Sequence, residues 1–503
     1  MDPSFNLISE PWLPCLQLDG SLVELSLRET LLRAHKLREI VGGNPLETAA
    51  IYRLLLALLH RVYGPADVDL WAALWEAGRW DPRPLDTYLS RWANRFDLFD
   101  RKHPFLQRAD ARVKPKSVAS LLPDVASGHN PTLFDHHIED NEIALSPAQA
   151  ARALLAALCF GLAGLSGLPA KFTDGPCARG VNFFAEGDNL FETLCLNLTR
   201  YPEETDTPQD RPAWEVDDPS FPPRDHPLGD LDLLTWPSRN ILLIPDTGAR
   251  RLAVCQMTMA PNLALHPEVL EPRKCYRKDD RRGYLVLRFT EERALWRDVS
   301  LLLGVKQETV RPVRAVTWLA ELVAGGYLPR ERRLRFMALG MANDQARIDF
   351  IRSERLPLPV AYLTQTMLID VIQECLHLAE ETARQLWGAT QTLARLLVAP
   401  ESDLNNGRKL ASADINALTR QWAVERHYWS RLELPFKELL DTLPKAPDGA
   451  RTSWRGILRI TAWNAFETLC RSLEQDTRRL KAVVQARDQL ALGLNRVLYF
   501  KGA

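Results

Sequence analysis

Apolar residues recur at helical spacing along the C-terminal part of the chain. One stripe joins Leu363, Met367, Val371, Cys375, Leu378 and Leu386, and similar runs cover residues 412–440, 454–473 and 480–498. A turn over residues 444–449 and other short connections place successive helices side by side in opposite directions. The pattern therefore predicts an all-α C-terminal four-helix bundle over residues 359–503.

The preceding residues alternate between helical and strand-like patterns. Two prolines within residues 354–360 separate them from the bundle. Helices are predicted at 25–37, 45–62 and 147–164, and strands at 233–244 and 284–289. Residues 5–15 alternate and are followed by a turn at Asp19-Gly20, which predicts a short hairpin or edge strands. The predicted fold class is thus α+β, with a large mixed and irregular N-terminal domain, residues 1–358, ahead of the bundle.

Three segments depart from these patterns. Residues 127–146 form a long polar loop, which inside a compact domain is typically functional or disordered. Residues 201–227 hold seven prolines and many acids, and are predicted to lie on the surface rather than in the core. In MALGMANDQARIDF, residues 337–350, two helix-compatible runs flank the polar residues 342–345. Gln345 there either caps a helix or presents its side-chain amide to a ligand.

The charge balance limits how the protein can bind nucleic acid. The 503 residues include 63 basic and 64 acidic side chains, a net charge of −1, which excludes a diffuse polycation. Basic patches occur at residues 273–282, at residues 330–335, and in the last fifty-three residues, where ten Lys or Arg stand against four acids. A solvated helix face is one explanation of such patches, and a track for a polyanion is the other.

The sequence indicates a cytoplasmic protein without a membrane segment. It has no run of eighteen or more apolar residues, and its first residues lack the layout of a signal peptide. The eight cysteines are scattered and none belongs to a CxxC pair, so buried free thiols are predicted rather than a zinc site. No metal or cofactor is expected.

One motif, DHH at residues 135–137 followed by two acids, is compatible with a metal-dependent phosphoesterase. That chemistry needs further carboxylates at strand ends. The nearest pair, Asp67 and Asp69, precedes a helical run and matches a helix cap. The sequence therefore predicts no catalytic site.

Glycines are frequent between residues 161 and 180, with Lys171 and Arg179 among them. Their spacing does not match a phosphate-binding GxxxxGK[ST] loop, and no predicted strand precedes them. Two interpretations stay open. The glycines either form a helix cap followed by turns, or they leave the backbone accessible to a ligand that must approach it closely.

Several segments together resemble one family. They are FNLISEPWLP (5–14), NPLETAAIYRLLLALLHRVYG (44–64), RKHPFLQ (101–107), NPTLFDHHIED (130–140), GPCARGVNFFAEGDNLFETLCLNL (175–198) and GDLDLLTWPSRNILLI (229–244). The order continues with MANDQARI (341–348) and ERHYWSRLEL (425–434). Over essentially its whole length the chain resembles the CasA family, the large subunits of type I-E CRISPR Cascade complexes.

The resemblance implies a non-catalytic subunit of an RNA-guided surveillance complex. In such a complex, base pairing with the RNA reads the target, while protein reads a short flanking motif on the duplex. The implied partners are the other Cascade subunits, the CRISPR RNA 5′ handle, a double-stranded DNA target and a recruited helicase-nuclease. The implied roles are recognition of the protospacer-adjacent motif, the start of duplex unwinding and R-loop formation.

The resemblance also assigns residues near the flanking motif. Gln345 matches a wedge glutamine that helps open the duplex, with Asn343 beside it. A long loop that meets the RNA handle and the motif region corresponds to residues 127–143 and includes Asn130, Leu133 and Phe134. Phe134 is expected to stack on a base.

Two further family elements match less closely. The loop that approaches the minor groove corresponds to Gly164, Gly167 and Lys171, where other members can have a denser glycine run. Some members insert a lysine into the groove, but residues 258–265 contain none, and Asn262 is the nearest polar candidate. The cysteine-rich zinc knob of some members is absent.

In the bundle, Arg451, Arg455 and Arg459 follow helical spacing and are expected to contact the displaced DNA strand. Two other functions remain alternatives. A purely structural bridging subunit would tolerate alanine at Gln345 and Phe134. A metal-dependent phosphoesterase would hydrolyse nucleic acid as the isolated protein.

Overall fold

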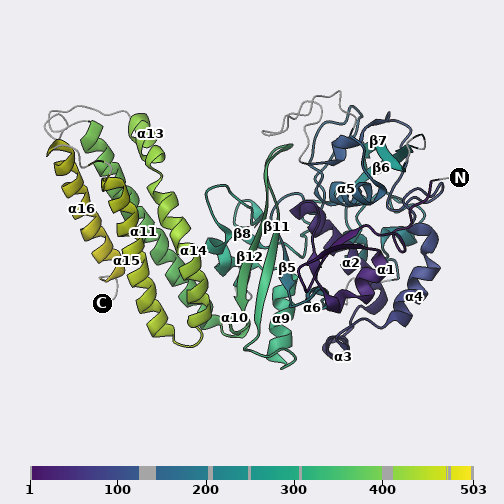
Figure 1. Cartoon of the computed structure of the whole chain (residues 1–503), viewed down its shortest axis with the longest axis horizontal. Helices are drawn as coiled ribbons and strands as arrows, with labels where there is room; N and C mark the ends of the chain where they lie inside the picture. The colour runs from purple at the N-terminus through teal and green to yellow at the C-terminus, as the bar shows by residue number, and fades with distance from the viewer. Residues whose placement is uncertain are drawn as a thin grey trace. The chain divides into compact units, whose positions relative to one another are not determined.

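The computed structural model describes residues 3–123, 143–201, 208–246, 248, 251–304, 309–398, 412–471, 473 and 477–499 (Figure 1). The chain divides into two compact units. Unit 1 comprises Met1–Leu295 and Gly304–Leu356, and unit 2 comprises Trp296–Leu303 and Pro357–Ala503.

Unit 1 mixes helices with four small three-stranded sheets, ordered β2-β1-β3, β10-β8-β9, β12-β11-β5 and β4-β7-β6. Its helices are α1 (Leu27–Leu32), α2 (Pro45–Tyr63), α3 (Val68–Ala77), α4 (Pro82–Arg91), α5 (Pro147–Phe160), α6 (Leu190–Asn197), α7 (Asp230–Leu234) and α9 (Arg314–Ala324). Its strands are β1 (Leu13–Gln17), β2 (Leu22–Leu25), β3 (Leu37–Ile40), β4 (Lys116–Ser117), β5 (Asn182–Glu186), β6 (Arg239–Asp246), β7 (Ala253–Pro261), β8 (Tyr276–Asp279), β9 (Gly283–Val286), β10 (Val310–Arg311), β11 (Arg333–Asp344) and β12 (Arg347–Pro359), of which β12 continues into unit 2.

The core of unit 1 forms around α2. Asn44 caps this helix by accepting hydrogen bonds from the backbone N–H groups of Leu46 and Glu47, and Pro45 occupies the first helical position. Apolar residues cover every side of α2, which packs against α4, α5, α6, α7 and β11. A helix that is apolar all round belongs in a core. The predicted helices at 45–62 and 147–164 are confirmed, although α5 ends before Gly161.

The prediction of helical runs at residues 337–350 was wrong. These residues lie in β11 and β12, which form a long hairpin, and β11 also pairs with β5 through partners such as Phe336 and Ala185. Residues 336–341 of β11 are all buried, so the strand lacks the apolar–polar alternation that distinguishes a half-exposed strand from a helix. Figure 1 shows β11 between β12 and β5.

Two other predictions need correction. Residues 233–244 do not form one strand, because α7 includes Leu233 and Leu234 and β6 begins only at Arg239.

The proline-rich segment 201–227 does not lie wholly on the surface. Trp214 is buried against Phe96 and Phe105, and its indole N–H donates to the hydroxyl of Tyr88 at 2.7 Å. Aromatic packing therefore holds part of this segment in the core.

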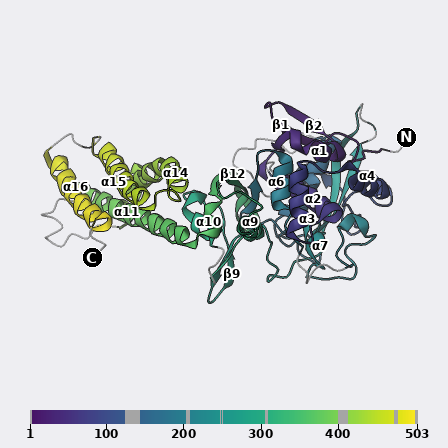
Figure 2. The same ribbon diagram turned by 90° about the horizontal axis from the view of Figure 1, so that it is seen from below.

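Unit 2 is helical in its described part. Its helices are α8 (Val299–Leu303), α10 (Ala361–Thr364), α11 (Thr366–Val398), α13 (Ser412–Trp422), α14 (Val424–Thr442), α15 (Pro447–Arg471) and α16 (Thr477–Leu498). Helix α11 packs against α13, α14, α15 and α16, which lie alongside it in Figures 1 and 2. Ala423, at a φ of 51°, separates α13 from α14, so these two helices together fill one position of the bundle. The predicted α+β fold class with a helical C-terminal region is confirmed.

Candidate nucleic-acid interface

Gln345 lies at the tip of the β11–β12 hairpin. The two-residue loop Gln345-Ala346 joins the strands, and residues 344–347 are exposed. Hairpin loops of this length favour a positive φ at their first residue, and Gln345 has a φ of 51°. The Nδ2 amide of Asn343 donates to the carbonyl oxygen of Gln345 at 2.9 Å and holds the turn. The interpretation of Gln345 as a helix cap was therefore wrong, because the residue turns a hairpin.

A second exposed turn follows α5, and we call residues 161–175 the glycine loop. Gly164 and Phe172 form an isolated antiparallel bridge, with N···O distances of 3.1 and 3.0 Å. The turn beyond this bridge exposes Gly167, Lys171 and Leu165, whose side chain is 86% exposed. A Cβ atom added at Gly164 or Gly167 would meet nothing within 4 Å. The backbone here is thus open to approach from outside.

Arg239, at the start of β6, holds the two arms of the glycine loop together. Its guanidinium donates to the carbonyl oxygens of Leu162 at 2.9 Å and Thr173 at 3.0 Å. A Cβ atom at Gly161 would lie 2.3 Å from the Cζ of Arg239, so this glycine is required by packing. Burial lowers the pKa of Arg239 to about 10, and Asp174 opposes that shift. Sequence analysis did not identify Arg239 as a site residue. The only indication in the sequence was its position directly before an apolar strand.

The hairpin tip and the glycine loop line one open cavity of about 280 Å³. Ala346, Arg347 and Ile348 contribute from the hairpin, and Gly161, Gly164 and Phe172 from the glycine loop. Residues 120–123 form another part of the wall. The structure thus brings the Gln345 turn and Gly164, predicted separately, to the same place. Asn130, Leu133 and Phe134 lie outside the described residues.

Asn262 is not among the residues that line this cavity. It follows β7, and its Nδ2 amide donates to the hydroxyl of Ser220 at 2.7 Å, while its backbone N–H donates to the Ser238 carbonyl at 3.3 Å. The side chain of Asn262 therefore already has a protein partner in this structure.

The basic patches of unit 1 differ in how exposed they are. Within residues 273–282, Lys274 is buried and donates to the Pro176 carbonyl at 2.9 Å, but Arg277, Lys278, Arg281 and Arg282 are exposed on the β8–β9 hairpin. Within residues 330–335, ion pairs join Arg332 to Glu192 at 2.7 Å and Arg335 to Glu186 at 3.4 Å. The first patch offers more uncompensated positive charge than the second.

The arginines predicted on the bundle lie together on α15. Arg451 and Arg455 approach the same carboxylate, Glu374 of α11, at 3.5 and 3.8 Å. The guanidinium of Arg459 lies 5.5 Å from the ring centre of Tyr499. Arg451 also pairs with Asp448 at 3.4 Å, so two carboxylates stand against the three arginines, each of which is half-exposed.

The structure describes one of the two motifs considered for metal chemistry. Asp67 caps α3 by accepting a hydrogen bond from the backbone N–H of Leu70, as predicted. Residues 135–137 lie outside the described part. Where the structure describes the chain, no three His, Cys, Asp or Glu residues gather as metal ligands, and no helix is long and apolar enough to span a membrane. Seven of the eight cysteines are buried and Cys255 is half-buried, all as free thiols.

Comparison with known proteins supplies the family. The family model of CRISPR-associated protein Cse1 matches residues 6–465. CRISPR-associated protein CasA/Cse1 of Thermus thermophilus is 36% identical over 508 residues, 96% of each chain. The crystal structure of CasA from Thermus thermophilus has a TM-score of 0.83 at 31% identity, covering 98% of this chain and 100% of that one. A chain of a CRISPR RNA-guided surveillance complex shares the fold, with a TM-score of 0.77 at 22% identity over 97% of this chain and 100% of that one. This chain belongs to the CasA/Cse1 family of CRISPR-associated proteins, the family of the type I-E CasA subunit.

Proposed function

We propose that this protein is the non-catalytic large subunit of a CRISPR RNA-guided surveillance complex. It recognises a protospacer-adjacent motif on invading double-stranded DNA, helps to start unwinding and helps to recruit a helicase-nuclease. The observation that carries the proposal is the meeting of the Gln345 turn and the glycine loop at one open cavity. A solved relative of the same fold is a chain of a CRISPR RNA-guided surveillance complex, which supports assembly with CRISPR RNA and other subunits.

The hairpin tip suits the opening of a duplex. A side-chain amide both donates and accepts hydrogen bonds, so Gln345 can replace contacts that a base pair loses when it is unstacked. Two paired strands support the tip from below, and Asn343 fixes its turn. A rigid support matters because a wedge that yields would not transmit its binding energy to the DNA.

The glycine loop suits the minor groove. Its backbone at Gly164 has open space where a side chain would stand, so a nucleic-acid backbone or base edge can come close. The minor groove offers a degenerate pattern of donors and acceptors, which fits recognition of more than one flanking motif. Lys171 and the exposed arginines of the β8–β9 hairpin add attraction to phosphates in the same unit.

The test compares R-loop formation by the reconstituted complex on two linear targets. One target is fully paired, and the other is opened by mismatches next to the flanking motif. Gln345→Ala should slow R-loop formation on the paired target and have much less effect on the opened one, because opening the first pairs costs a few kcal/mol only when the duplex is closed.

Two further variants separate the amide from the turn. Gln345→Gly keeps the positive φ but lacks the amide, so it should be as slow as Gln345→Ala. Gln345→Asn keeps an amide and tolerates the turn, so it should retain more activity. Wild-type rates for all three variants on both targets would favour the structural bridging alternative, and equal losses on both targets would assign Gln345 to structure or RNA binding.

A further inference from the structure

The glycine loop begins and ends beside a cysteine. Cys159 is the penultimate residue of α5, and Cys177 follows the loop after Pro176. The backbone N–H of Cys177 donates to the carbonyl of Cys159 at 2.9 Å, and that of Gly175 donates to the carbonyl of Gly161 at 2.8 Å. We call this pair of contacts the loop base. It sets where both arms of the glycine loop emerge.

The two cysteines are neighbours at the loop base. Cys159 is 8% exposed and Cys177 4%, and the backbone hydrogen bond of 2.9 Å joins the two residues directly. Disulfides require Cα atoms roughly 4.4–6.8 Å apart. The direct backbone hydrogen bond holds Cys159 and Cys177 close to each other in the fold.

The surroundings of Cys177 favour its thiolate. Arg53 of α2 donates from Nη1 to the Cys177 sulfur at 3.5 Å and pairs with Glu271 at 2.6 Å. Arg273 lies 3.1 Å from the same Glu271, and Lys274 binds the carbonyl of Pro176. Three basic side chains thus gather around one carboxylate.

The pKa values of the two thiols move apart accordingly. The neighbouring Cys159 side chain lowers the pKa of Cys177, against the effects of burial and of the Glu271 carboxylate, and Arg53 and Lys274 contribute to the lowering. The same contact raises the pKa of Cys159. Elsewhere in the protein, burial raises the pKa of Cys15 and of Cys375 to about 12. Because the thiolate is the reactive form, Cys177 differs from these cysteines in reactivity.

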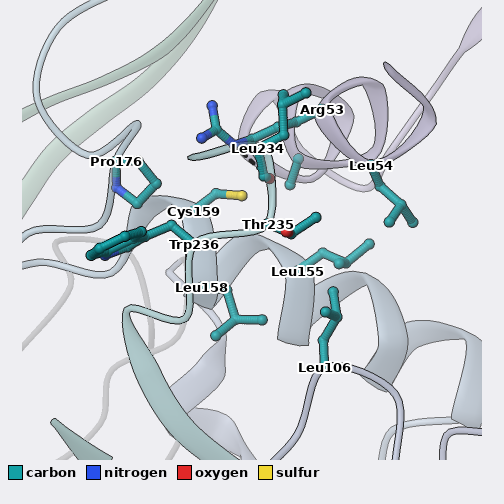
Figure 3. Close-up of a pocket in the computed structure, with 11 residues that line it drawn as sticks. Arg53, Leu54, Leu106, Leu155, Leu158, Cys159, Pro176, Leu234, Thr235 and Trp236 are labelled. Carbon is teal, nitrogen blue, oxygen red and sulfur yellow. Dashed lines mark hydrogen bonds between the residues drawn. The ribbon is translucent and has the colours of Figure 1, made fainter. Parts of the chain in front are cut away.

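A small cavity adjoins Cys159 and Arg53. About 20 Å³ of space, enough for roughly one water molecule, is lined by Arg53, Cys159, Pro176 and Trp236 among others. Figure 3 shows Arg53 on α2 and the Cys159 side chain beside this space. Only a small reagent, near the size of a water molecule, fits in this space.

We propose that Cys159 and Cys177 form an oxidation site, at which a peroxide or a small disulfide converts the thiol pair into a disulfide that locks the base of the glycine loop. With hydrogen peroxide, the Cys177 thiolate attacks one oxygen and the O–O bond breaks, which leaves a sulfenic acid and a hydroxide that takes up a proton. The Cys159 sulfur then attacks the Cys177 sulfur, the S–O bond breaks and water leaves. The two sulfurs lose two electrons, and the peroxide is reduced to two waters.

The chemical test uses the full-length protein. After treatment with a small excess of hydrogen peroxide at pH 7, the protein is denatured, alkylated and digested with trypsin, which cuts between the two cysteines at Lys171. We expect a cross-linked peptide pair that lacks two hydrogen atoms and separates on reduction with dithiothreitol. It should form about tenfold faster than Cys195 is oxidised, since burial keeps the thiol of Cys195 protonated.

Variants of the cysteines provide the controls. Cys159→Ser and Cys177→Ser should each abolish the cross-link, and Cys195→Ser, a buried cysteine away from the pair, should leave it unchanged. The proposal is overturned if Cys159 and Cys177 of the wild-type protein both stay alkylatable while Cys255 is oxidised, or if Cys177 is oxidised further without cross-linking. These outcomes are read on the wild-type chain and need no variant to fold.

Hydrogen exchange tests the lock itself. Amides of residues 161–176 should exchange at least severalfold more slowly in the oxidised protein than in the reduced one, and oxidation should not change their exchange in Cys177→Ser. Unchanged exchange despite a complete cross-link would overturn the lock. The proposed function assigns this loop to DNA, but neither measurement involves DNA, so failure of that function would leave the result intact.

Discussion

The two units place their charged residues differently. Buried polar side chains of unit 1 include the ionisable residues Arg53, His60, Glu186, Arg239 and Glu271, whereas those described in unit 2 are the threonines 382, 390, 419 and 461. Charges of unit 2 pair nearer the surface, as Arg487 and Glu467 do through two contacts of 2.7 and 2.6 Å. Unit 1 buries ionisable side chains because its backbone is less regular than the helical backbone of unit 2.

Helices satisfy their own carbonyl groups except in the last turn, and irregular segments do not. In unit 1, Arg53 donates to the carbonyls of Leu233 and Leu234 at the end of the short helix α7, and Arg239 donates to those of Leu162 and Thr173. In unit 2, two of the buried threonines bond within their own helices, Thr390 with the carbonyl of Leu386 at 2.8 Å and Thr419 with that of Ile415 at 3.0 Å. Buried cations in unit 1 thus satisfy carbonyl groups that the helices of the bundle satisfy by themselves.

The largest effect should come from Arg53→Met. This change removes the 2.6 Å partner of buried Glu271, which keeps only Arg273 at 3.1 Å as an ion-pair partner among the described residues, and it removes donors from two backbone carbonyls. Unit 1 should therefore lose about 3–5 kcal/mol of unfolding free energy. Arg487→Met in unit 2 is the matched control and should cost less than about 1 kcal/mol, because its ion pair is half-exposed. Denaturant unfolding monitored by hydrogen exchange assigns each loss to its unit. Similar losses for both variants would contradict the comparison.

Acid should weaken unit 1 through His60. Burial is the main cause that lowers its pKa from about 6.5 to about 3, so between these values the unfolded chain binds a proton that the folded chain does not. The free energy of unfolding should therefore fall as pH drops, by roughly 2 kcal/mol between pH 6.5 and 5 from this residue. Asp210, whose pKa burial raises to about 6, acts in the opposite direction.

His60→Phe isolates that contribution. The variant keeps a buried ring but cannot titrate, so the stability difference from wild type should shift in favour of the variant as pH falls, with Asp210 common to both. Chemical denaturation at several pH values measures it. A difference that stays constant between pH 7 and 5 would mean that His60 is not the acid-sensitive group.

The same contrast explains what the sequence could predict. The bundle follows from a 3.6-residue apolar period, because each of its helices has one buried face and local spacing carries the information. The hairpin at residues 337–350 was missed because β11 is buried between two strands and has no alternation to reveal it. A buried strand without alternation is therefore less predictable than a helix with one exposed face.

The candidate site was less accessible to sequence reasoning. Gln345 and Gly164 came from the family resemblance, and nothing local indicated that the residues directly after Gln345 line the same cavity as Gly164. Arg239 and the Cys159–Cys177 pair were not identified as functional candidates. Arg239 contacts Leu162, which lies 77 residues away in the chain, and such long-range partners leave no periodic trace. Periodic patterns in a sequence predict which face of a helix or strand is buried. Arg239, Cys159 and Cys177 instead act through single contacts between segments that are distant in the sequence or irregular.

A smaller effect is expected from Arg239→Met. It removes the donors for Leu162 and Thr173, so unit 1 should lose about 1–3 kcal/mol and the glycine loop should exchange its amides faster. Arg179→Met is the matched control in the same segment. Arg179 pairs with Asp174 in a half-exposed position, so its loss should cost less than about 1 kcal/mol. Unchanged exchange of residues 161–175 in Arg239→Met would show that the loop holds its shape without this arginine.

The smallest stability effect should come from substitutions of the α15 arginines, which the proposed function assigns to the displaced DNA strand. Arg455 has only a 3.8 Å contact with Glu374, so Arg455→Gln together with Arg459→Gln should change the stability of the bundle by less than about 1 kcal/mol.

If these side chains meet phosphates of the displaced strand, the same variant should weaken DNA binding by the reconstituted complex uniformly across flanking motifs. The plot of log affinity against log salt concentration should then become less steep, by roughly one to two units of slope. The reason is that binding with fewer phosphate contacts releases fewer counterions. Lys437→Gln on α14, whose partner is Glu433 at 2.7 Å, is the control for a surface charge with its own local partner and should leave the slope unchanged. A loss confined to one flanking motif would mean that these arginines take part in motif recognition, and an unchanged slope would return them to an ordinary solvated helix face.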